Sequence, residues 1–258
     1  MEEKQKLYQE YFELIDSLQI DVNDDDYKVL DDHIRRLEQL DVVESSILSI
    51  FDLHKKHQAY ISSKYKTYFG WDLDKASEGT DYQDSRTHPD DLIYLLKVGI
   101  YFTKLVLSKP VENRKDYKLI TDYRMLGLNN QYIRIIEQQL CLETDKNGNI
   151  WLGLSVTDIS PDHDITTPAR CRALNFKTGE VFYYEENTNE KPEIHQLSKR
   201  EKEVLQMVSE GLISKEIADK LFISVNTVNT HRQRIVEKLK VSNTFEAISF
   251  AKQLGLIN

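Results

Sequence analysis

Four polar side chains near the C-terminus have types and a spacing suited to contacting DNA bases. Asn226, Asn229, Thr230 and Gln233 recur at intervals of three and four residues, so a helix would place them along one face. Asn and Gln can each form two hydrogen bonds to adenine, and a threonine methyl can touch the methyl group of thymine. We therefore expect these four residues to contact base edges in the major groove.

Basic and hydroxyl side chains close to this face could bind the DNA backbone. Phosphate contacts fix the register of a protein on the duplex and carry no sequence information. The residues that we expect in this role are Lys215, Thr227, Arg232, Arg234 and Lys238. The alternative, a plain solvated helix face, is disfavoured by the four-helix context described next.

The elements that must position these residues have clear start and stop signals. Ser198 and Glu201 have the spacing of a capping box, which predicts a first helix that Gly211 ends. A second helix is expected from Ser214 to about Phe222, and Ser224 is the N-cap of a third. That third helix buries Val228, Ile235 and Leu239. A fourth helix is expected after residues 243–244, ending at Gly255. The segment 196–258 is thus predicted to be all-α.

This segment closely resembles the LuxR/FixJ-type helix-turn-helix family over its whole length. The matching residues are Leu197, Arg200, Glu201, Glu203, Val204, Leu205, Gly211, Lys215, Glu216, Ile217, Ala218, Leu221, Ile223, Ser224, Thr227, Val228, His231, Ile235, Lys238 and Leu239. The resemblance implies that the third helix enters the major groove of double-stranded DNA and that the fourth makes a dimer contact.

A residue for that dimer contact follows from the pattern of the fourth helix. Ala247, Ile248, Ala251 and Leu254 share one arc, which we expect to face the domain. Phe250 falls outside the arc, so it is predicted to be exposed in a monomer and to contribute to a homodimer on DNA.

Charge divides the chain unevenly. Residues 195–258 hold ten Lys and Arg against seven Asp and Glu, a net charge of +3. The residues before them carry −12, because the whole chain carries −9. Such asymmetry points to different partners for the two parts.

The middle of the chain has an α+β pattern. Residues 150–156 alternate as a strand, the turn 145–149 precedes them, and residues 132–142 supply the partner strand. A second hairpin is expected from residues 173–176 and 181–184. We predict an antiparallel sheet with helices beside it.

This region resembles a PAS domain. Residues 49–71 look like the opening two strands and helix of that family, and residues 88–91 (His-Pro-Asp-Asp) look like a helix start of many PAS domains. The motifs at 122–124, 132–134, 145–149 and 158–159 follow in the same order. The resemblance implies a sensory or dimerising module whose helices and curved sheet can enclose a small ligand.

The signal for the PAS-like module is a small molecule or another protein, and the sequence assigns no cofactor. No cysteine lies in the context that flavin-binding relatives use, and lone histidines at 54, 57 and 88 do not define a haem ligand. Pro89, Asp90 and Asp91 suit the positive end of a helix better than a metal site. Aromatic residues in the segment 60–71 either line a ligand site or form core.

The domain organisation that we expect has four parts. Residues 1–49 form a helical segment with a solvated acidic loop at 21–26, 50–184 the PAS-like domain, 185–195 a polar linker open to proteolysis, and 196–258 the helix-turn-helix domain. The apolar run 92–107 predicts a buried helix and no membrane span. Without a signal-peptide pattern, and with only Cys141 and Cys171, a cytoplasmic protein is expected.

Three functions compete for this sequence. The favoured one is a transcription regulator in which the PAS-like module controls the DNA-binding domain. The alternative is a sigma-factor-like promoter-recognition protein, but no aromatic-rich basic helix for promoter melting lies upstream. An enzyme with a DNA-binding tail is disfavoured, because no nucleophile–base set, phosphate loop or metal cluster is evident.

Overall fold

The computed structural model describes residues 2–184, 194–241, 243–253 and 256–257. The chain forms two compact units, residues 1–172 and 173–258. The helical segment 1–49 therefore groups with the PAS-like region, and the hairpin after residue 172, which the sequence pattern placed at the end of that region, groups with the C-terminal helices. Of the predicted linker at 185–195, residues 185–193 lie outside the described residues, and residues 194–195 belong to a short strand, Ile194–Gln196.

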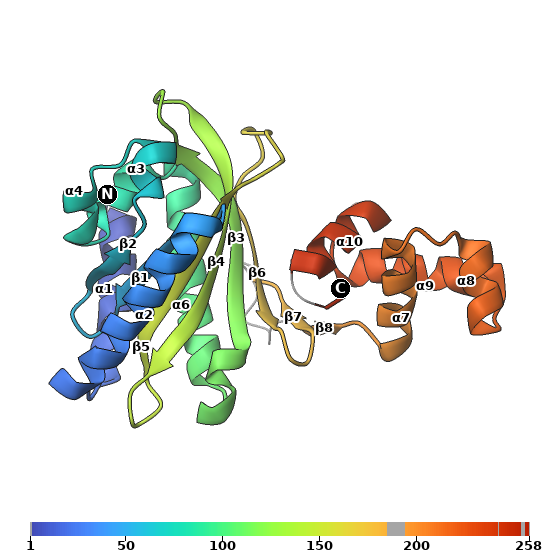
Figure 1. The fold of residues 1–258 in the computed structure, drawn as a ribbon, viewed down its shortest axis with the longest axis horizontal. Helices are drawn as coiled ribbons and strands as arrows, with labels where there is room; N and C mark the ends of the chain where they lie inside the picture. Colours follow the sequence, from blue (N-terminus) through green and yellow to red (C-terminus); the bar gives the residue numbers. More distant parts are fainter. Residues whose placement is uncertain (1, 185–193, 242, 254–255, 258) are drawn as a thin grey trace. The chain divides into compact units, whose positions relative to one another are not determined.

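The N-terminal unit is an antiparallel sheet with helices on both faces (Figure 1). Its elements are α1 (Glu2–Ser17), α2 (Asp24–Val43), β1 (Ile47–Asp52), β2 (His57–Ile61), α3 (Lys64–Phe69), α4 (Leu73–Ser77), α5 (Asp81–Arg86), α6 (Pro89–Leu107), a 3-10 helix η1 (Val111–Asp116), β3 (Tyr117–Leu126), β4 (Tyr132–Thr144) and β5 (Ile150–Ile159). The strand order is β2-β1-β5-β4-β3. Two strands, then helices, then three antiparallel strands make the unit PAS-like, as predicted.

Helix α2 covers one face of this sheet. Its Leu30 packs against Ile50 of β1 and against Trp151 and Leu152 of β5. The helix begins at Asp24, so the acidic residues 24–26, predicted to be a solvated loop, are instead its first turn, in which Asp24 and Asp25 are exposed and Asp26 is half-buried. Asn23 and Asp26 form a capping box there, and carboxylates are favoured at the positive end of a helix.

Helices α1, α3, α4, α5 and α6 lie on the other face of the sheet. The predicted buried helix at 92–107 is the main part of α6, and no helix among the described residues is long and apolar enough to cross a membrane. Tyr65, Phe69 and Trp71 are buried in a cluster with Tyr123 and β-strand residues. These aromatics are therefore core.

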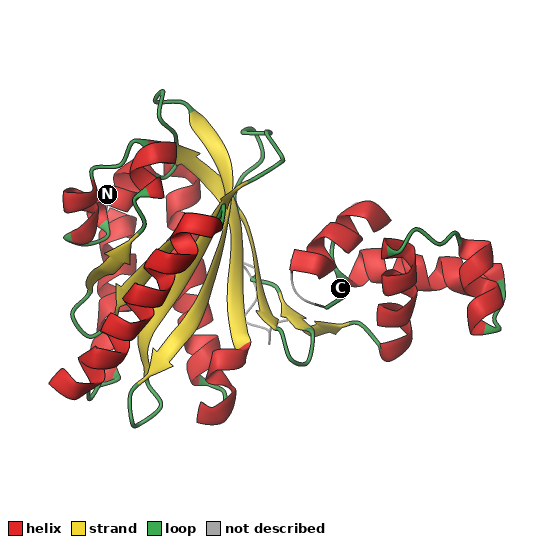
Figure 2. Ribbon diagram, in the orientation of Figure 1, coloured by secondary structure: helices red, strands yellow, loops and turns green. Residues whose placement is uncertain are grey.

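The C-terminal unit is mainly helical (Figure 2). Strand β6 (Arg170–Asn175) crosses the boundary between the units and pairs with β7 (Glu180–Phe182), which pairs with β8 (Ile194–Gln196). Four helices follow, α7 (Lys199–Ser209), α8 (Ser214–Leu221), α9 (Val225–Lys238) and α10 (Thr244–Gln253). The four predicted helices are confirmed; the expected end of the last at Gly255 lies outside the described residues.

Candidate nucleic-acid interface and ligand cavity

Helix α9 is held by a small apolar core beneath it. Val228 and Ile235 on α9 are fully buried, as are Val204 and Leu205 on α7 and Ile217 on α8. The predicted capping box starts α7: Ser198 Oγ accepts from the Glu201 backbone N–H, and the Glu201 carboxylate accepts from the Ser198 N–H at 2.7 Å. Ser224 caps α9 by accepting from the Thr227 N–H at 3.1 Å. Local capping and this core fix which face of α9 points outward.

The outward face of α9 carries all four residues predicted to contact bases. Asn226, Asn229, Thr230 and Gln233 are exposed, so the face itself is confirmed. Thr230 Oγ1 donates to the Asn226 carbonyl at 3.0 Å, which satisfies the hydroxyl and leaves the methyl available for an apolar contact. Asn229 Oδ1 accepts from Ser214 at 2.9 Å, and Gln233 donates to Glu237 at 3.2 Å. Each amide keeps a free N–H and a free oxygen lone pair with which it could contact a base.

The residues predicted to bind phosphates divide into two groups. Lys215, Thr227 and Arg234 are exposed, whereas Arg232 and Lys238 are half-buried. Arg232 donates to Ser214 Oγ at 3.2 Å. Lys238 Nζ donates to the Glu201 carboxylate at 2.7 Å and to the Gln196 carbonyl at 3.0 Å. Lys238 therefore supports the start of α7, a structural contact that sequence reasoning missed.

The expected exposure of Phe250 is wrong. Phe250 is only 6% exposed, while Phe245 on the same helix is 81% exposed. Helix α10 contacts both α7 and α9, so its buried face is wider than that of a helix packed against a single neighbour. The sequence pattern predicted one narrow buried face on this helix, and Phe250 lies just outside that face.

The turn between α8 and α9 contains an unusual residue. Phe222 has a left-handed backbone, with φ of 54°, and its side chain is 93% exposed. A bulky residue in this region of φ and ψ is strained, and strain of this kind concentrates at functional positions. The exposed phenyl ring lies immediately before the N-terminal end of α9.

The N-terminal unit contains a cavity of about 260 Å³, partly open to solvent, that is lined by the sheet and by helices α1, α5 and α6. Its size lies near the lower end of the ~300–1,000 Å³ that is usual for ligand sites. Apolar side chains supply much of the wall, among them Phe51, Leu96, Phe102, Val106 and Leu119. The aromatic segment 60–71 does not contribute to the wall: Tyr65, Phe69 and Trp71 form core, whereas Tyr60 is half-buried and Tyr68 is exposed.

Polar groups also face this cavity. Glu137 is 5% exposed and its carboxylate accepts from the hydroxyls of Tyr123, at 2.9 Å, and Ser155. Burial, reinforced by the neighbouring Glu137, raises the pKa of the Tyr123 hydroxyl well above its usual value, so Tyr123 acts as a donor to the carboxylate. Tyr8 and Tyr11 of α1 reach the cavity from the N-terminal segment.

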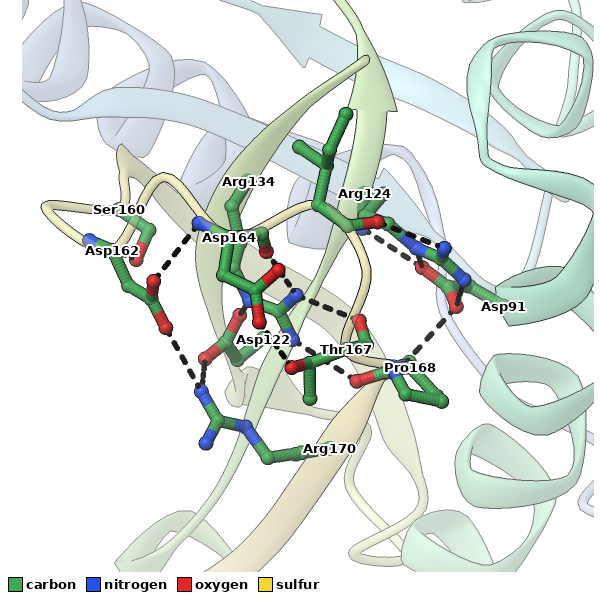
Figure 3. Close-up of polar contacts among 12 residues, drawn as sticks. Asp91, Asp122, Arg124, Arg134, Ser160, Asp162, Asp164, Thr167, Pro168 and Arg170 are labelled. Atoms are coloured by element: carbon green, nitrogen blue, oxygen red, sulfur yellow. Dashed lines mark hydrogen bonds and ion pairs between the residues drawn. The ribbon is translucent and has the colours of Figure 1, made fainter.

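Charged residues from the motifs at 88–91, 122–124 and 132–134 form a buried charge cluster, which Figure 3 shows. Asp91 is fully buried and accepts from Arg124 Nη2 at 2.6 Å and Nε at 2.9 Å, and from the backbone N–H of Ala169 at 3.1 Å. Although burial would raise the pKa of Asp91, these hydrogen bonds lower it below its usual value. Asp91 is thus a structural anion, more than the helix-start residue that its position predicted.

Arg134 plays the same part for the loop after β5. Its guanidinium donates to Asp122 at 2.5 Å and to the carbonyls of Asp164, Thr167 and Pro168 at 2.8–3.0 Å (Figure 3). The cluster therefore fastens residues 164–169 to the sheet. No group of three His, Cys, Asp or Glu within the described ranges is placed to hold a metal ion.

Comparison with known proteins identifies the C-terminal segment. Residues 195–251 match the family described as bacterial regulatory proteins, luxR family. This chain is 42% identical over 62 residues to the oxygen regulatory protein NreC of Staphylococcus carnosus. It is 46% identical over 63 residues to the transcriptional regulatory protein DesR of Bacillus subtilis. Each alignment covers 24% of this chain, and 29% and 32% of the respective relative. The chain thus spans about a third of the length of these relatives.

Among solved structures, a phage VqmA–DPO complex aligns over 88% of this chain and 89% of that one, at 17% identity and a TM-score of 0.35. The PAS-like character of the N-terminal unit follows from the order of strands and helices in this chain. The C-terminal segment, by contrast, is a LuxR-type helix-turn-helix domain. The match favours this class over the sigma-factor alternative.

Proposed function

We propose that this protein is a sequence-specific transcription regulator whose DNA binding responds to a small molecule held in the PAS-like unit. One observation carries the proposal: the same chain holds a LuxR-type domain with an exposed polar face on α9 and a second unit with a partly polar cavity. A cavity of this kind favours a small-molecule signal over a protein signal, since a protein partner would need no interior space.

Within the DNA-binding domain, Asn226, Asn229, Thr230 and Gln233 contact base edges in this proposal. Lys215, Thr227 and Arg234 are the phosphate contacts, because each is exposed. Arg232 can join them only by giving up its hydrogen bond to Ser214. Lys238 is assigned to the fold and not to DNA, since it is tied to Glu201.

The proposal is tested first by selecting sequences from a random duplex library with the full chain. We expect enrichment of one motif, and a tighter complex with that motif than with a scrambled duplex. Specific complexes are typically about 10³–10⁷ tighter than non-specific ones at physiological salt. A protein that enriches no sequence would contradict the regulator assignment.

The link between cavity and DNA is tested with a matched pair of variants at Gly99. Gly99 lies on α6 at the cavity wall, and a Cβ placed there meets no atom within 4 Å. Gly99→Leu should fill part of the cavity, whereas Gly99→Ala leaves most of it open. Native mass spectrometry should show a bound small molecule on the wild type and on Gly99→Ala only. Operator affinity should change when that molecule is removed, and Gly99→Leu should show no such change.

A homodimer on DNA is part of the proposal, with Phe245 in place of Phe250 as the contact on α10. Phe245→Asp should reduce cooperative binding to an operator with two half-sites and leave single-half-site binding intact. Phe250→Ala should instead destabilise the domain, because Phe250 is buried. Unchanged cooperativity in Phe245→Asp would remove this helix from the dimer model.

A further inference from the structure

We propose that the cavity of the N-terminal unit selects a small organic cation, with the Glu137 carboxylate as its binding partner. This inference rests on the proposed function and adds the chemical class of the signal. It starts from the charges around the cavity, which no sequence motif indicated.

The cavity wall holds acidic side chains and no basic one. Its lining residues include Glu137 and Asp84 but no Lys, Arg or His. Asp84 already has a cation, because Lys4 Nζ lies 2.9 Å from its carboxylate. Glu137 has none among the described residues, and its only side-chain partners are the hydroxyls of Tyr123 and Ser155.

A carboxylate buried without a cation is costly. Buried charges in folded proteins are normally paired with an opposite charge, and unpaired ones are rare. Two hydroxyl donors satisfy only part of the roughly four lone-pair sites of a carboxylate, so Glu137 can accept further N–H donors. A cationic group in the cavity would give the Glu137 carboxylate both a positive counterion and further hydrogen-bond donors.

Strand register places further acceptors next to this carboxylate. Glu137 of β4 lies opposite Thr121 of β3, and the next cavity-facing residue on β4, Gln139, lies opposite Ser155 of β5. Gln58 of β2 also lines the cavity, and its buried Oε1 has no hydrogen-bond partner. The sheet therefore presents a polar patch rich in acceptors, which suits a ligand that donates several hydrogen bonds.

The opposite wall sets the shape of the ligand. Leu96, Phe102 and Val106 of α6 are apolar and face the same space, and Phe51 of β1 adds an apolar side chain from the sheet. At a liquid volume of about 30 Å³ per water, the cavity holds roughly nine waters, which is comparable to one substituted ring. The geometry thus points to a single-ring molecule with an amidinium or ammonium group.

Three probes of one shape and different charge test the inference on the full chain: benzamidine, benzamide and benzoate. Binding is measured by calorimetry and by the shift in melting temperature. Benzamidine should bind at least on the order of tenfold more tightly than benzamide, because charge-assisted hydrogen bonds are the stronger ones. Benzoate should show no binding. Equal or tighter binding of benzamide or benzoate would overturn the inference, and so would the absence of binding by all three.

Variants place the effect in the cavity. Glu137→Gln should abolish the preference for benzamidine, while Asp84→Asn should keep it. Gly99→Leu should weaken all probes, which separates cavity binding from adsorption to the acidic surface. A benzamidine preference that survives Glu137→Gln, or benzamidine binding that is not weakened by Gly99→Leu, would refute the assignment. If Glu137→Gln does not fold, the probe order in the wild type and the weakened binding of benzamidine to Gly99→Leu still decide.

A result against the cationic ligand can be distinguished from a result against the proposed regulator function. A neutral or anionic preference would leave a ligand-responsive regulator intact and change only the class of ligand. Operator selection and the Gly99 pair, measured without any probe, test the regulator separately.

Discussion

Two regions of this protein use polar side chains in opposite ways. In the N-terminal unit, every guanidinium nitrogen of the buried Arg124 and Arg134 donates to a carboxylate or carbonyl. On the outward surface of the C-terminal domain, Asn226, Lys215 and Arg234 are exposed and have no side-chain partner among the described residues. Arginine occurs in both regions, but it has protein partners in the first and is exposed to solvent in the second.

This contrast separates structural polar groups from those available to a ligand. A buried charge is stable only with its full set of partners, so removing one partner leaves an uncompensated charge. An exposed side chain is satisfied by water and can exchange that water for a phosphate or a base. Substitution should therefore affect unfolding in the first region and DNA binding in the second.

The largest effect is expected for Asp91→Asn. The change leaves Arg124 buried without its counterion, which costs about 3–5 kcal/mol for a buried pair. Urea unfolding followed by tryptophan fluorescence measures this in the full chain, since both tryptophans, Trp71 and Trp151, lie in the N-terminal unit. Asp90→Asn is the matched control, because Asp90 is exposed beside the same pair. Similar unfolding curves for the two variants would break the contrast.

The next effect concerns Gln233→Ala on the outward face of α9. A base-contacting side chain contributes roughly 1–3 kcal/mol of discrimination. Affinity for the cognate operator should fall by that amount with relaxed preference at one base pair, while the melting temperature and the salt dependence change little. Gln206→Ala is a matched control, because Gln206 makes the same contact with Glu210 that Gln233 makes with Glu237. Equal weakening on cognate and scrambled duplexes would show that Gln233 does not contact a base.

A smaller effect, on the fold of the DNA-binding domain, is expected for Glu201→Gln. Burial alone would raise the pKa of Glu201, but hydrogen bonds from Lys238 and Ser198 lower it below its ordinary value. Glu201 therefore stabilises the domain fully above its unfolded pKa of about 4.3, and this contribution is lost as the pH falls through the lower folded value.

Loss of this capping contact should cost about 1 kcal/mol at pH 7. Hydrogen exchange of α7 backbone amides measures the loss, and the difference between variant and wild type should begin to shrink below about pH 4 and vanish as the pH falls through the lowered folded pKa of the carboxylate. Glu203→Gln serves as control, since the Glu203–Arg200 pair is more exposed. A difference that grows on acidification would contradict the depressed pKa.

Local signals made much of the fold predictable from sequence. The capping box of Ser198 and Glu201, the N-cap Ser224 and the turn at 145–149 involve residues within four positions of each other. The outward face of α9 was predictable for the same reason, since helical spacing alone sets it. The helical start at Asp24 was missed because the run of aspartates obscured the cap at Asn23.

Long-range pairing accounts for most of what the sequence did not reveal. Asp91 and Arg124 are 33 positions apart, and Lys238 and Glu201 are 37 apart, so spacing gives no sign that they meet. The charge of the cavity wall likewise depends on Glu137 and Asp84, and on there being no basic side chain among the described lining residues, which only the folded unit brings together. Phe250 was misplaced because α10 packs against two helices.

The smallest change, and the sharpest test of the exposed region, is expected for Lys215→Ala. Lys215 is exposed in the first turn of α8 and has no partner in the described part of the chain. If it neutralises one phosphate, its loss should weaken cognate and scrambled duplexes alike and make the plot of log affinity against log salt shallower by about one unit. Lys220→Ala, on the same helix, changes the net charge equally and should leave the slope unchanged. If both variants shift the slope together, net charge and not a defined contact would govern binding; if neither does, Lys215 does not reach the backbone.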